Sequence, residues 1–486
     1  MTPLNPKEKK SLLKVLRNAF SDMVECEVVD VKEAYRLPTK KVKVQIKEQP
    51  FQINLYPDGK PLHIYPEPTF DENDKQASSK SFILFDPERY YSGVSGFYRL
   101  NAGDKIILGG KDLEQRAFLN IPKELPARKL SIANDDGELV FKSLVNNPQS
   151  CIAPLLKDKK VNQLFNWRLN KLARIREIFG GPIEPLSNHA AFTLIREANR
   201  ILAAEAHRPL NAQGEPGGLL HLPDDSPVII LGDLHAKPDN LLTVLSQNSY
   251  LEALEAKSAY LVIIGDAVHP EGEVALDEME SSMLIMDLIL KLKLSFPSQF
   301  FYLRGNHDSF SQEIAKGGIP QGLLWEKELI EKRGDDYRSE MLRLYDLLPY
   351  LVYSSNFVSC HAAAPTTSIT PEDIINIKQQ PKLINELINN RLKRPNRPAG
   401  YAKGDVIRLR KSLGIRPDAP FIVGHTPLSN DETIWENVGD IQNHHIIYSS
   451  DTNQVGAMVQ IGDTIYPFKF PVEQVMNKIN SASDPF

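Results

Sequence analysis

The sequence VIILGDLH, residues 228–235, sets the fold of the second half of this chain. Four consecutive apolar residues followed by Gly-Asp indicate a buried strand that stops at a turn. Asp233 and His235 lie two positions apart, so an extended backbone directs both side chains to the same side. A carboxylate and an imidazole at the carboxyl end of a strand are half of a site for a divalent metal ion.

The same pattern, an apolar strand that ends in polar residues, occurs four more times. These residues are Asp266 after 261–264, Arg304, Asn306 and His307 after 300–303, His361 after 356–360, and His425 after 421–423. Each motif alone is typical of an ordinary turn or a core histidine. However, five of the 11 histidines fall in these segments: His235, His269, His307, His361 and His425. Ligands of open α/β sheets bind outside the carboxyl ends of the strands, so the five segments together predict a metal site.

Composition excludes several other classes of protein. The chain has 486 residues, a length that suggests about two to four domains. A net charge of -5 argues against bulk attraction to nucleic acid or anionic lipid. Cys26, Cys151 and Cys360 are far apart, which favours neither a disulfide framework nor a thiolate zinc site.

Targeting signals of the usual kinds are not recognised in the sequence. The first twenty residues carry charge but no long apolar segment of a secretory signal, and no stretch approaches the roughly 18 apolar residues of a membrane span. We therefore expect a cytoplasmic protein without stable membrane insertion. Secretion by a non-Sec route into another cell's cytosol is the alternative.

The pattern of apolar and polar residues changes along the chain. We expect a basic amphipathic helix at about 6–20, β-rich sequence from Val28 to about Val140, and helices at 157–181 and 188–206. A Pro/Gly-rich connection at 207–225 then leads into the half that carries the motifs. We predict a β-rich accessory domain with a connecting helix at 1–185, a catalytic domain at 186–472 and a polar tail at 473–486.

Taken together, the motifs resemble the calcineurin-like metallophosphoesterase superfamily, whose signature is GDxH, GDxV, GNH(D/E), a later His, and GH. Within it, LRGNHD at 303–308 and NQVGAMV at 453–459 are similar to the serine/threonine phosphoprotein phosphatase (PPP) family. The resemblance covers about residues 190–472. It implies an α/β fold in which a β-sandwich is flanked by helices, here preceded by a separate β-rich accessory domain.

The resemblance also implies a role for each motif residue. Asp233 and His235 would bind a first divalent ion, Asp266 would bridge two ions, and Asn306, His361 and His425 would complete the second. His307 would protonate the leaving-group oxygen, and Arg304 would hold a phosphate oxygen. Such ligands admit manganese, iron or zinc, and we expect manganese to serve in vitro.

Three departures from the family concern the substrate side of the site. The family's second motif reads GDxVDRG, whereas residues 265–272 read GDAVHPEG. His269 therefore stands where an aspartate pairs with the catalytic histidine, and the arginine that clamps phosphate is missing. Glu271 is a candidate for the lost carboxylate, and Asp308 stands where glutamate is usual.

A second phosphate-binding arginine is expected before the last metal histidine. Arg397 is the candidate, because residues 404–406 and the helix after them match the segment that comes after that arginine in the family. The charged run at 391–398 is equally typical of a solvated loop.

We therefore expect a metal-dependent phosphatase that acts on phosphorylated proteins, with phosphoserine, phosphothreonine or phosphotyrosine as substrate. One alternative is a nucleotide phosphoesterase, such as a dinucleoside tetraphosphate hydrolase or a cyclic-nucleotide phosphodiesterase. Another is a catalytically silent interaction protein with the same fold. Nucleic acid is not an expected partner, and nothing in residues 1–185 identifies a partner for the accessory domain.

Overall fold

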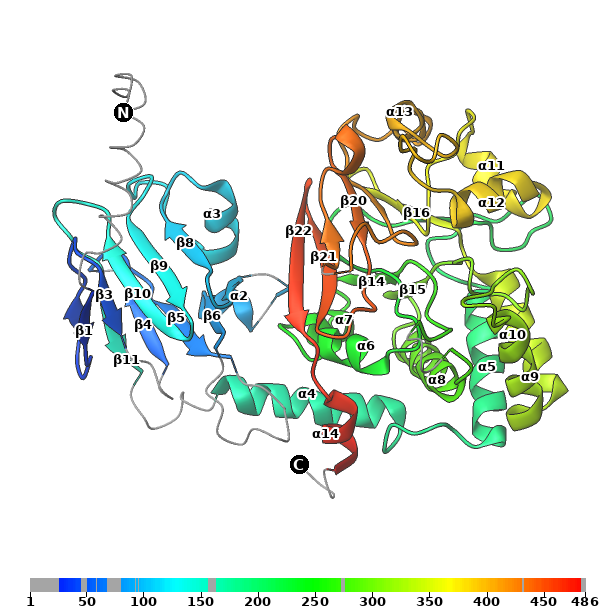
Figure 1. Ribbon diagram of the computed structural model, residues 1–486, viewed down its shortest axis with the longest axis horizontal. Coiled ribbons are helices and arrows are strands. Elements are labelled where there is room, and N and C mark those ends of the chain that lie inside the picture. The colour runs from blue at the N-terminus through cyan, green and yellow to red at the C-terminus, as the bar shows by residue number, and fades with distance from the viewer. Residues whose placement is uncertain are drawn as a thin grey trace, which may run out of the picture. The chain divides into compact units, whose positions relative to one another are not determined.

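The computed structural model describes residues 26–44, 50–57, 59–67, 80–91, 93–94, 96–155, 163–271, 276–430 and 432–481 (Figure 1). The chain divides into two compact units, residues 1–167 and residues 168–486. This division falls within helix α4 (Gln163–Phe179), whereas the sequence-based boundary at 185/186 comes after that helix. The helix expected at 6–20 lies outside the described residues.

The first unit is built from two sheets. The five-stranded sheet has the order β1 (Glu27–Val29), β3 (Val42–Val44), β10 (Glu138–Ser143), β9 (Leu130–Asp135) and β8 (Lys105–Leu108). The six-stranded sheet has the order β2 (Tyr35–Arg36), β11 (Cys151–Pro154), β4 (Phe51–Asn54), β5 (Leu62–Pro66), β6 (Phe82–Phe85) and β7 (Phe97–Leu100). Two short helices, α2 (Pro87–Tyr90) and α3 (Leu113–Leu119), complete it. The expected β-rich region is confirmed.

The second unit is a β-sandwich. One sheet has the order β12 (Leu219–His221), β16 (Leu351–Tyr353), β17 (Val358–Cys360), β18 (Phe421–Val423), β20 (His444–Ile447) and β19 (Ile434–Trp435). The other has the order β15 (Phe300–Tyr302), β14 (Tyr260–Ile263), β13 (Val228–Leu231), β21 (Gln454–Ile461) and β22 (Thr464–Pro471). Apolar side chains from both sheets, among them Ile230, Val262, Val352 and Ile422, form one buried cluster.

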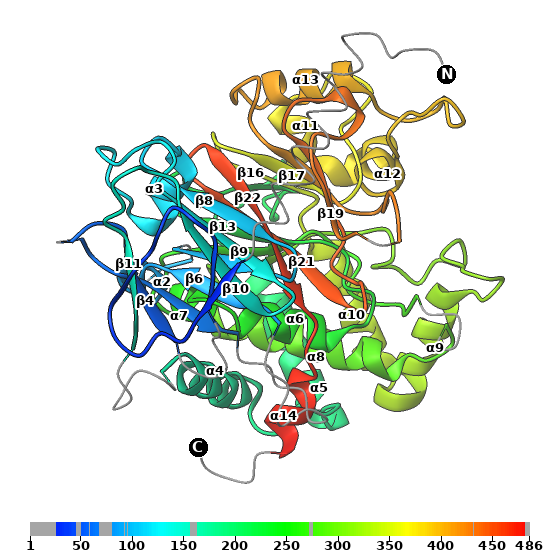
Figure 2. The same ribbon diagram turned by 60° about the vertical axis from the view of Figure 1, so that its left-hand side comes forward.

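Helices cover the sandwich (Figure 2). Helices α11 (Pro371–Ile375), α12 (Pro381–Asn389) and α13 (Lys403–Ser412) share a second apolar cluster with the β17–β18 sheet, in which Ile374, Leu387 and Val406 are fully buried. The remaining helices are α5 (Asn188–Leu202), α6 (Pro238–Leu245), α7 (Tyr250–Glu255), α8 (Glu280–Ser295), α9 (Gln321–Arg333) and α10 (Asp335–Leu347). Two 3-10 turns lie at Ile377–Gln379 and Val438–Asp440. The predicted sandwich flanked by helices is confirmed.

All five predicted motif strands form, but they belong to two sheets. β13, β14 and β15 are parallel neighbours in one sheet, and β17 and β18 are parallel neighbours in the other. Parallel strands place their carboxyl ends at one edge. The motif residues therefore converge from the edges of both layers of the sandwich.

The predicted polar tail is partly a helix, which corrects that expectation. Helix α14 (Val475–Ser481) buries Val475 and Ile479 completely. The Met476 N–H donates to Asp239 Oδ1 at 2.7 Å, and Arg176 Nη1 donates to the Ile479 carbonyl at 2.9 Å. The helix is stabilised by docking rather than by a strong apolar pattern of its own, so its sequence reads as polar. Among the described residues, no helix has the length and apolar character needed to cross a bilayer.

Candidate metal centre

Asp233 is fixed by the turn that ends β18. Its carboxylate accepts from the His425 N–H, at 3.0 Å for Oδ1 and 3.1 Å for Oδ2. A Cβ on Gly424 would lie 2.1 Å from Asp233 Oδ1, and a Cβ on Gly305 would lie 2.1 Å from Asp266 Oδ1. These two motif glycines are therefore required for the close approach of backbone to carboxylate.

Two of the histidines have a tautomer set by backbone carbonyls. His235 Nδ1 lies 3.3 Å from the Val268 carbonyl and 3.1 Å from the His269 carbonyl. His361 Nδ1 lies 2.9 Å from the Ile264 carbonyl. Since a carbonyl can only accept, Nδ1 carries a proton in both rings, and Nε2 is the nitrogen that faces the site.

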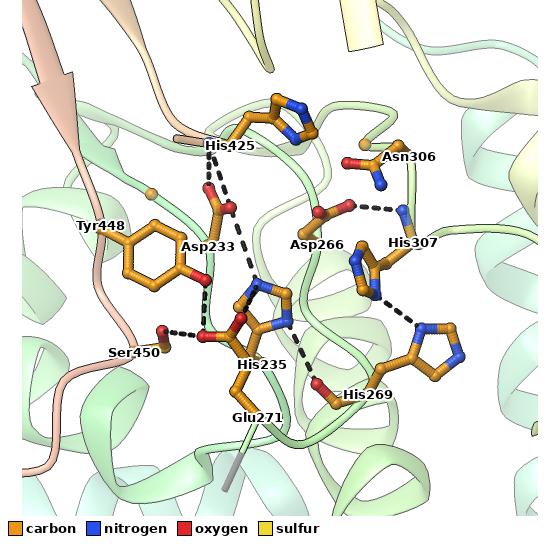
Figure 3. Close-up of polar contacts among 12 residues, drawn as sticks. Asp233, His235, Asp266, His269, Glu271, Asn306, His307, His425, Tyr448 and Ser450 are labelled. Carbon is orange, nitrogen blue, oxygen red and sulfur yellow. Dashed lines mark hydrogen bonds and ion pairs between the residues drawn. The ribbon is translucent and has the colours of Figure 1, made fainter. Parts of the chain in front are cut away.

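The donor atoms gather in two groups that share one carboxylate (Figure 3). Asp233, His235 and Asp266 each offer an atom within 4.8 Å of the others, and so do Asp266, His361 and His425. Asn306 joins the second group, because its Oδ1 lies 2.9 Å from His361 Nε2. The structure thus brings together all six predicted ligands.

The charges at this point favour a cation. Burial lowers the pKa of His235, but the carboxylates of Glu271, Asp233 and Asp266 outweigh it and raise that pKa to about 9. Burial is likewise outweighed at His361, where Asp266 and Asp233 raise the pKa to about 9. A buried surplus of negative charge that holds protons in this way also attracts metal ions.

The donor set fits a pair of divalent ions. His425 Nε2 is buried without a hydrogen-bond partner, as expected for an atom reserved for a metal. The set of carboxylate, imidazole and amide oxygen suits hard or borderline divalent cations. Asp266, with two oxygens, is the residue that both ions would share.

Backbone strain is concentrated in this site. His235, Asp266, His269 and His425 all have positive φ, at 41°, 53°, 69° and 62°. Left-handed backbone at residues other than glycine costs of order 1–3 kcal/mol each and persists where the surroundings impose it. The backbone of the motif turns is therefore strained at four residues whose side chains form the candidate site.

His269 contacts His307, in the place where the family has an aspartate. The two Nδ1 atoms are 3.0 Å apart, so one ring donates and the other accepts (Figure 3). Burial lowers the pKa of His269 well below its usual range, so this ring is neutral. Burial also lowers the pKa of His307, to about 4.

Glu271 does not replace that aspartate, contrary to the suggestion drawn from the sequence. Its Oε1 lies 2.6 Å from Lys316 Nζ and 3.7 Å from His235 Nε2, and its Oε2 accepts from the Tyr448 hydroxyl at 2.5 Å. Burial raises the pKa of Glu271, but His235, Lys316 and Tyr448 outweigh it and lower the pKa to about 2. Glu271 is thus a carboxylate beside the first donor group.

Asp308, which stands where the family has glutamate, braces the third motif. Its Oδ2 accepts from the Gly305 N–H at 2.7 Å and from the Asp266 N–H at 3.3 Å, and its Oδ1 accepts from the Tyr302 hydroxyl. Burial, with a contribution from Asp266, raises the pKa of Asp308 to about 6.

The arginines differ in how the structure places them. Arg304 Nε and Nη1 are buried without a hydrogen-bond partner, and the guanidinium lies 5.2 Å from the Tyr345 ring centroid. Arg397 is exposed in a tight turn closed by two 2.9 Å backbone hydrogen bonds with Arg394. Arg391 is half-buried, and burial and the positive charge of Arg397 lower its pKa, while the carboxylate of Asp233 acts in the opposite direction.

Sequence reasoning missed Tyr448, Lys316 and Arg391. Tyr448 directly follows β20 and forms a parallel bridge to Asp233. Its position after an apolar strand is the same signal that identified the other motifs. Lys316 lies in a loop and Arg391 follows α12, so no strand-end pattern marks either residue.

The second unit is similar to known proteins. The model of the calcineurin-like phosphoesterase family matches residues 226–444. The serine/threonine-protein phosphatase rdgC of Drosophila melanogaster is 36% identical over 109 residues, which are 21% of this chain and 15% of rdgC. An uncharacterized protein of Caenorhabditis elegans is 32% identical over 89 residues, 17% of this chain and 32% of that protein. The matches thus span less than two thirds of either relative.

A solved structure is also similar. It is a protein serine/threonine phosphatase from Saccharomyces cerevisiae with similarity to human phosphatase PP5, and it aligns with a TM-score of 0.45 and 16% identity. The alignment covers 59% of this chain and 90% of that structure. The family match and the rdgC match agree with the motifs, so this chain carries a calcineurin-like metallophosphoesterase domain related to the serine/threonine phosphoprotein phosphatases.

Proposed function

We propose that this chain is a metal-dependent phosphatase that hydrolyses phosphomonoesters on proteins. The observation that carries the proposal is the pair of donor groups joined at Asp266, with His307 beside them. The backbone N–H of His307 donates to Asp266 Oδ1 at 2.7 Å. This arrangement supplies both a metal site and a candidate acid. The match to rdgC, a serine/threonine-protein phosphatase, favours phosphoproteins as the substrate class.

Each side chain then has a chemical task. Two divalent ions, when bound, would neutralise phosphate charge and lower the pKa of a water molecule, so that it can attack phosphorus as hydroxide. Asp233, His235 and Asp266 would hold one, and Asp266, Asn306, His361 and His425 the other. Manganese, iron and zinc all suit these donors, and manganese is our choice for assays.

Arg304 and His307 act on the substrate itself. Arg304 has two buried nitrogens without partners, which would donate to a phosphate oxygen. His307 would protonate the leaving oxygen from Nε2 while its Nδ1 proton is accepted by His269. His269 is thus a positioning residue, and as a neutral ring it stabilises the His307 cation less than a carboxylate would.

Arg391 is a better placed candidate than Arg397 for a second contact to phosphate. Its charge already interacts with that of Asp233, whereas Arg397 lies on an exposed turn. We propose that Arg391 binds phosphate. Arg397 would act only indirectly, through the electrostatic effect of its positive charge on Arg391. An Arg391→Ala variant with an unchanged inhibition constant for inorganic phosphate would contradict this.

Substrate class is tested by a panel. Wild-type protein with manganese is given phosphoserine, phosphothreonine and phosphotyrosine peptides and a dinucleoside tetraphosphate, beside an Asp266→Asn control. We expect phosphate release from at least one phosphopeptide class and none from the control. Turnover of the dinucleotide alone would instead make the chain a nucleotide phosphoesterase, and no turnover of any substrate would favour an inactive binding protein.

A further inference from the structure

Glu271 faces the nitrogen of His235 that is free to bind a metal. Its Oε1 lies 3.7 Å from His235 Nε2, the same separation that Asp233 Oδ2 has from that atom. His235 Nδ1 is already committed to backbone carbonyls, so only Nε2 is available. Figure 3 shows the carboxylates of Asp233 and Glu271 both directed at this nitrogen of the His235 ring.

The separation suits two ligands of one ion. Ligand atoms of a divalent ion lie about 2.1 Å from it, so two ligands can be up to about 4.2 Å apart. Donors 3.7 Å apart, the spacing of Glu271 Oε1 and His235 Nε2, would subtend an angle of about 120° at such an ion. Glu271 lies outside the group in which the atoms of Asp233, His235 and Asp266 are within 4.8 Å of one another, so its carboxylate has to shift toward Asp233 to join the same ion.

Other residues hold the Glu271 carboxylate in this orientation. The Tyr448 hydroxyl donates to Oε2 at 2.5 Å, and Ser450 Oγ lies 3.4 Å from the same oxygen. Lys316 Nζ instead lies 2.6 Å from Oε1, the oxygen that faces His235, and would compete with a metal for it. The backbone of Tyr448 also forms an isolated parallel β-bridge with the backbone of Asp233. Hydrogen bonds of this kind commonly orient the carboxylates that bind metals.

We infer that Glu271 is a further protein ligand of the first divalent ion, beside Asp233, His235 and Asp266. The inference rests on the proposed function, because it requires that site to hold a metal. It puts three carboxylates around the first ion, next to the position where the related phosphatases have a phosphate-binding arginine. The first ion is then bound more tightly but attracts a phosphate dianion less strongly.

A simpler role for Glu271 would be to anchor the Lys316 loop. The two roles predict different effects of a Lys316→Ala substitution on manganese affinity. If Glu271 binds metal, a Lys316→Ala variant frees a carboxylate oxygen and leaves manganese affinity unchanged or higher. If Glu271 only anchors the loop, Lys316→Ala and Glu271→Gln have the same effect.

The test is a manganese titration of metal-free, full-length protein, followed by calorimetry and by the electron paramagnetic resonance signal of free Mn²⁺. The variants are Glu271→Gln, Lys316→Ala, Tyr448→Phe and a control, Glu278→Gln. Glu278 accepts from the Ser281 N–H at 2.9 Å at the start of α8 and belongs to no donor group. Thermal unfolding of each metal-free variant reports whether it is folded.

We expect wild type to bind two Mn²⁺ and Glu271→Gln to weaken one of the two sites about 10–100-fold. Tyr448→Phe should weaken the same site less, and it keeps the inference testable if Glu271→Gln does not fold. Lys316→Ala and Glu278→Gln should not weaken either site. Wild-type affinity in Glu271→Gln, or equal weakening in Lys316→Ala, would overturn the role of Glu271 and leave the proposed function standing. A wild-type protein that binds no Mn²⁺ would overturn both.

Discussion

At the scale of single residues, the candidate site keeps the residue types of the motifs that carry the proposed ligands, but the residue that faces the proposed acid, His307, differs from the family motif. His307 donates its backbone N–H to Asp266, and its Nδ1 lies 3.0 Å from Nδ1 of a neutral imidazole, His269. Burial lowers the pKa of His307 to about 4. An acid of this kind is active only while it is protonated, so its partner controls the pH range of catalysis.

A His269→Asp variant tests that control. A carboxylate stabilises the protonated ring and raises its pKa. Activity that depends on protonated His307 is lost as pH rises through that pKa, so the alkaline limb of the kcat profile should move to higher pH. The profile is measured with an alkyl phosphoester, whose leaving group needs a proton.

The matching controls use His307. His307→Ala should lower kcat for an alkyl phosphoester about 10²–10⁴-fold, and far less for p-nitrophenyl phosphate, whose leaving group is stable as an anion. Equal losses on both substrates, or an unchanged profile in His269→Asp, would show that His307 is not the acid.

Gly424 allows a second prediction at this scale. A methyl group there would lie 2.1 Å from Asp233 Oδ1, so Gly424→Ala should displace that ligand and weaken manganese binding strongly. Gly404→Ala is the control, because its Cβ would lie 3.7 Å from Arg408 Nη1 in helix α13. That change should stabilise the protein by about 1 kcal/mol. Similar manganese affinity in the two variants would contradict the close approach at Gly424.

At the scale of elements, the strands that carry the motifs were predictable and their assembly was not. The runs at 228–231 and 421–423 have the apolar pattern of buried strands, which the structure confirms. Nothing in a local pattern assigns β13 and β18 to different sheets, because that choice depends on contacts between residues far apart in the chain. Helix α14 was missed for the same reason: its stability comes from docking.

A buried ion pair joins two of the helices. Arg333 in α9 donates to Asp287 in α8 through two nitrogens, at 2.7 and 2.6 Å, and the two side chains are 2% and 0% exposed. Asp287→Ala leaves the buried guanidinium with the Tyr337 hydroxyl but without a carboxylate, and should lower the free energy of unfolding by about 3–5 kcal/mol. Urea denaturation measures this.

An exposed pair provides the contrast. Lys327 and Glu331 lie 3.6 Å apart, and their side chains are 67% and 55% exposed. Glu331→Ala should change stability by less than about 0.5 kcal/mol. If the two alanine variants are equally stable, the buried pair does not link α8 to α9.

At the scale of the whole molecule, all candidate site residues belong to the unit formed by residues 168–486. The sequence predicted the six candidate metal donors that the structure brings together, because residue type and strand-end position sufficed. It did not place Glu271, Lys316 and Tyr448 together, because they come from three separate loops or strand ends. The candidate metal donors were therefore more predictable from the sequence than the residues around them.

Removing the first unit tests whether it contributes to catalysis. A fragment of residues 156–486 retains every candidate ligand. We expect its kcat for p-nitrophenyl phosphate with manganese to equal that of the full chain. A folded fragment without activity would show that the accessory unit contributes to catalysis.

Two ions joined at Asp266 are, in our proposal, the feature that makes this chain a phosphatase. The decisive test is to titrate Mn²⁺ into metal-free protein while phosphate release from phosphopeptides is followed. We predict no release without metal, and a rate that saturates at two Mn²⁺ per chain and is abolished by Asp266→Asn. Release that needs no metal, or that survives Asp266→Asn, would contradict the proposal.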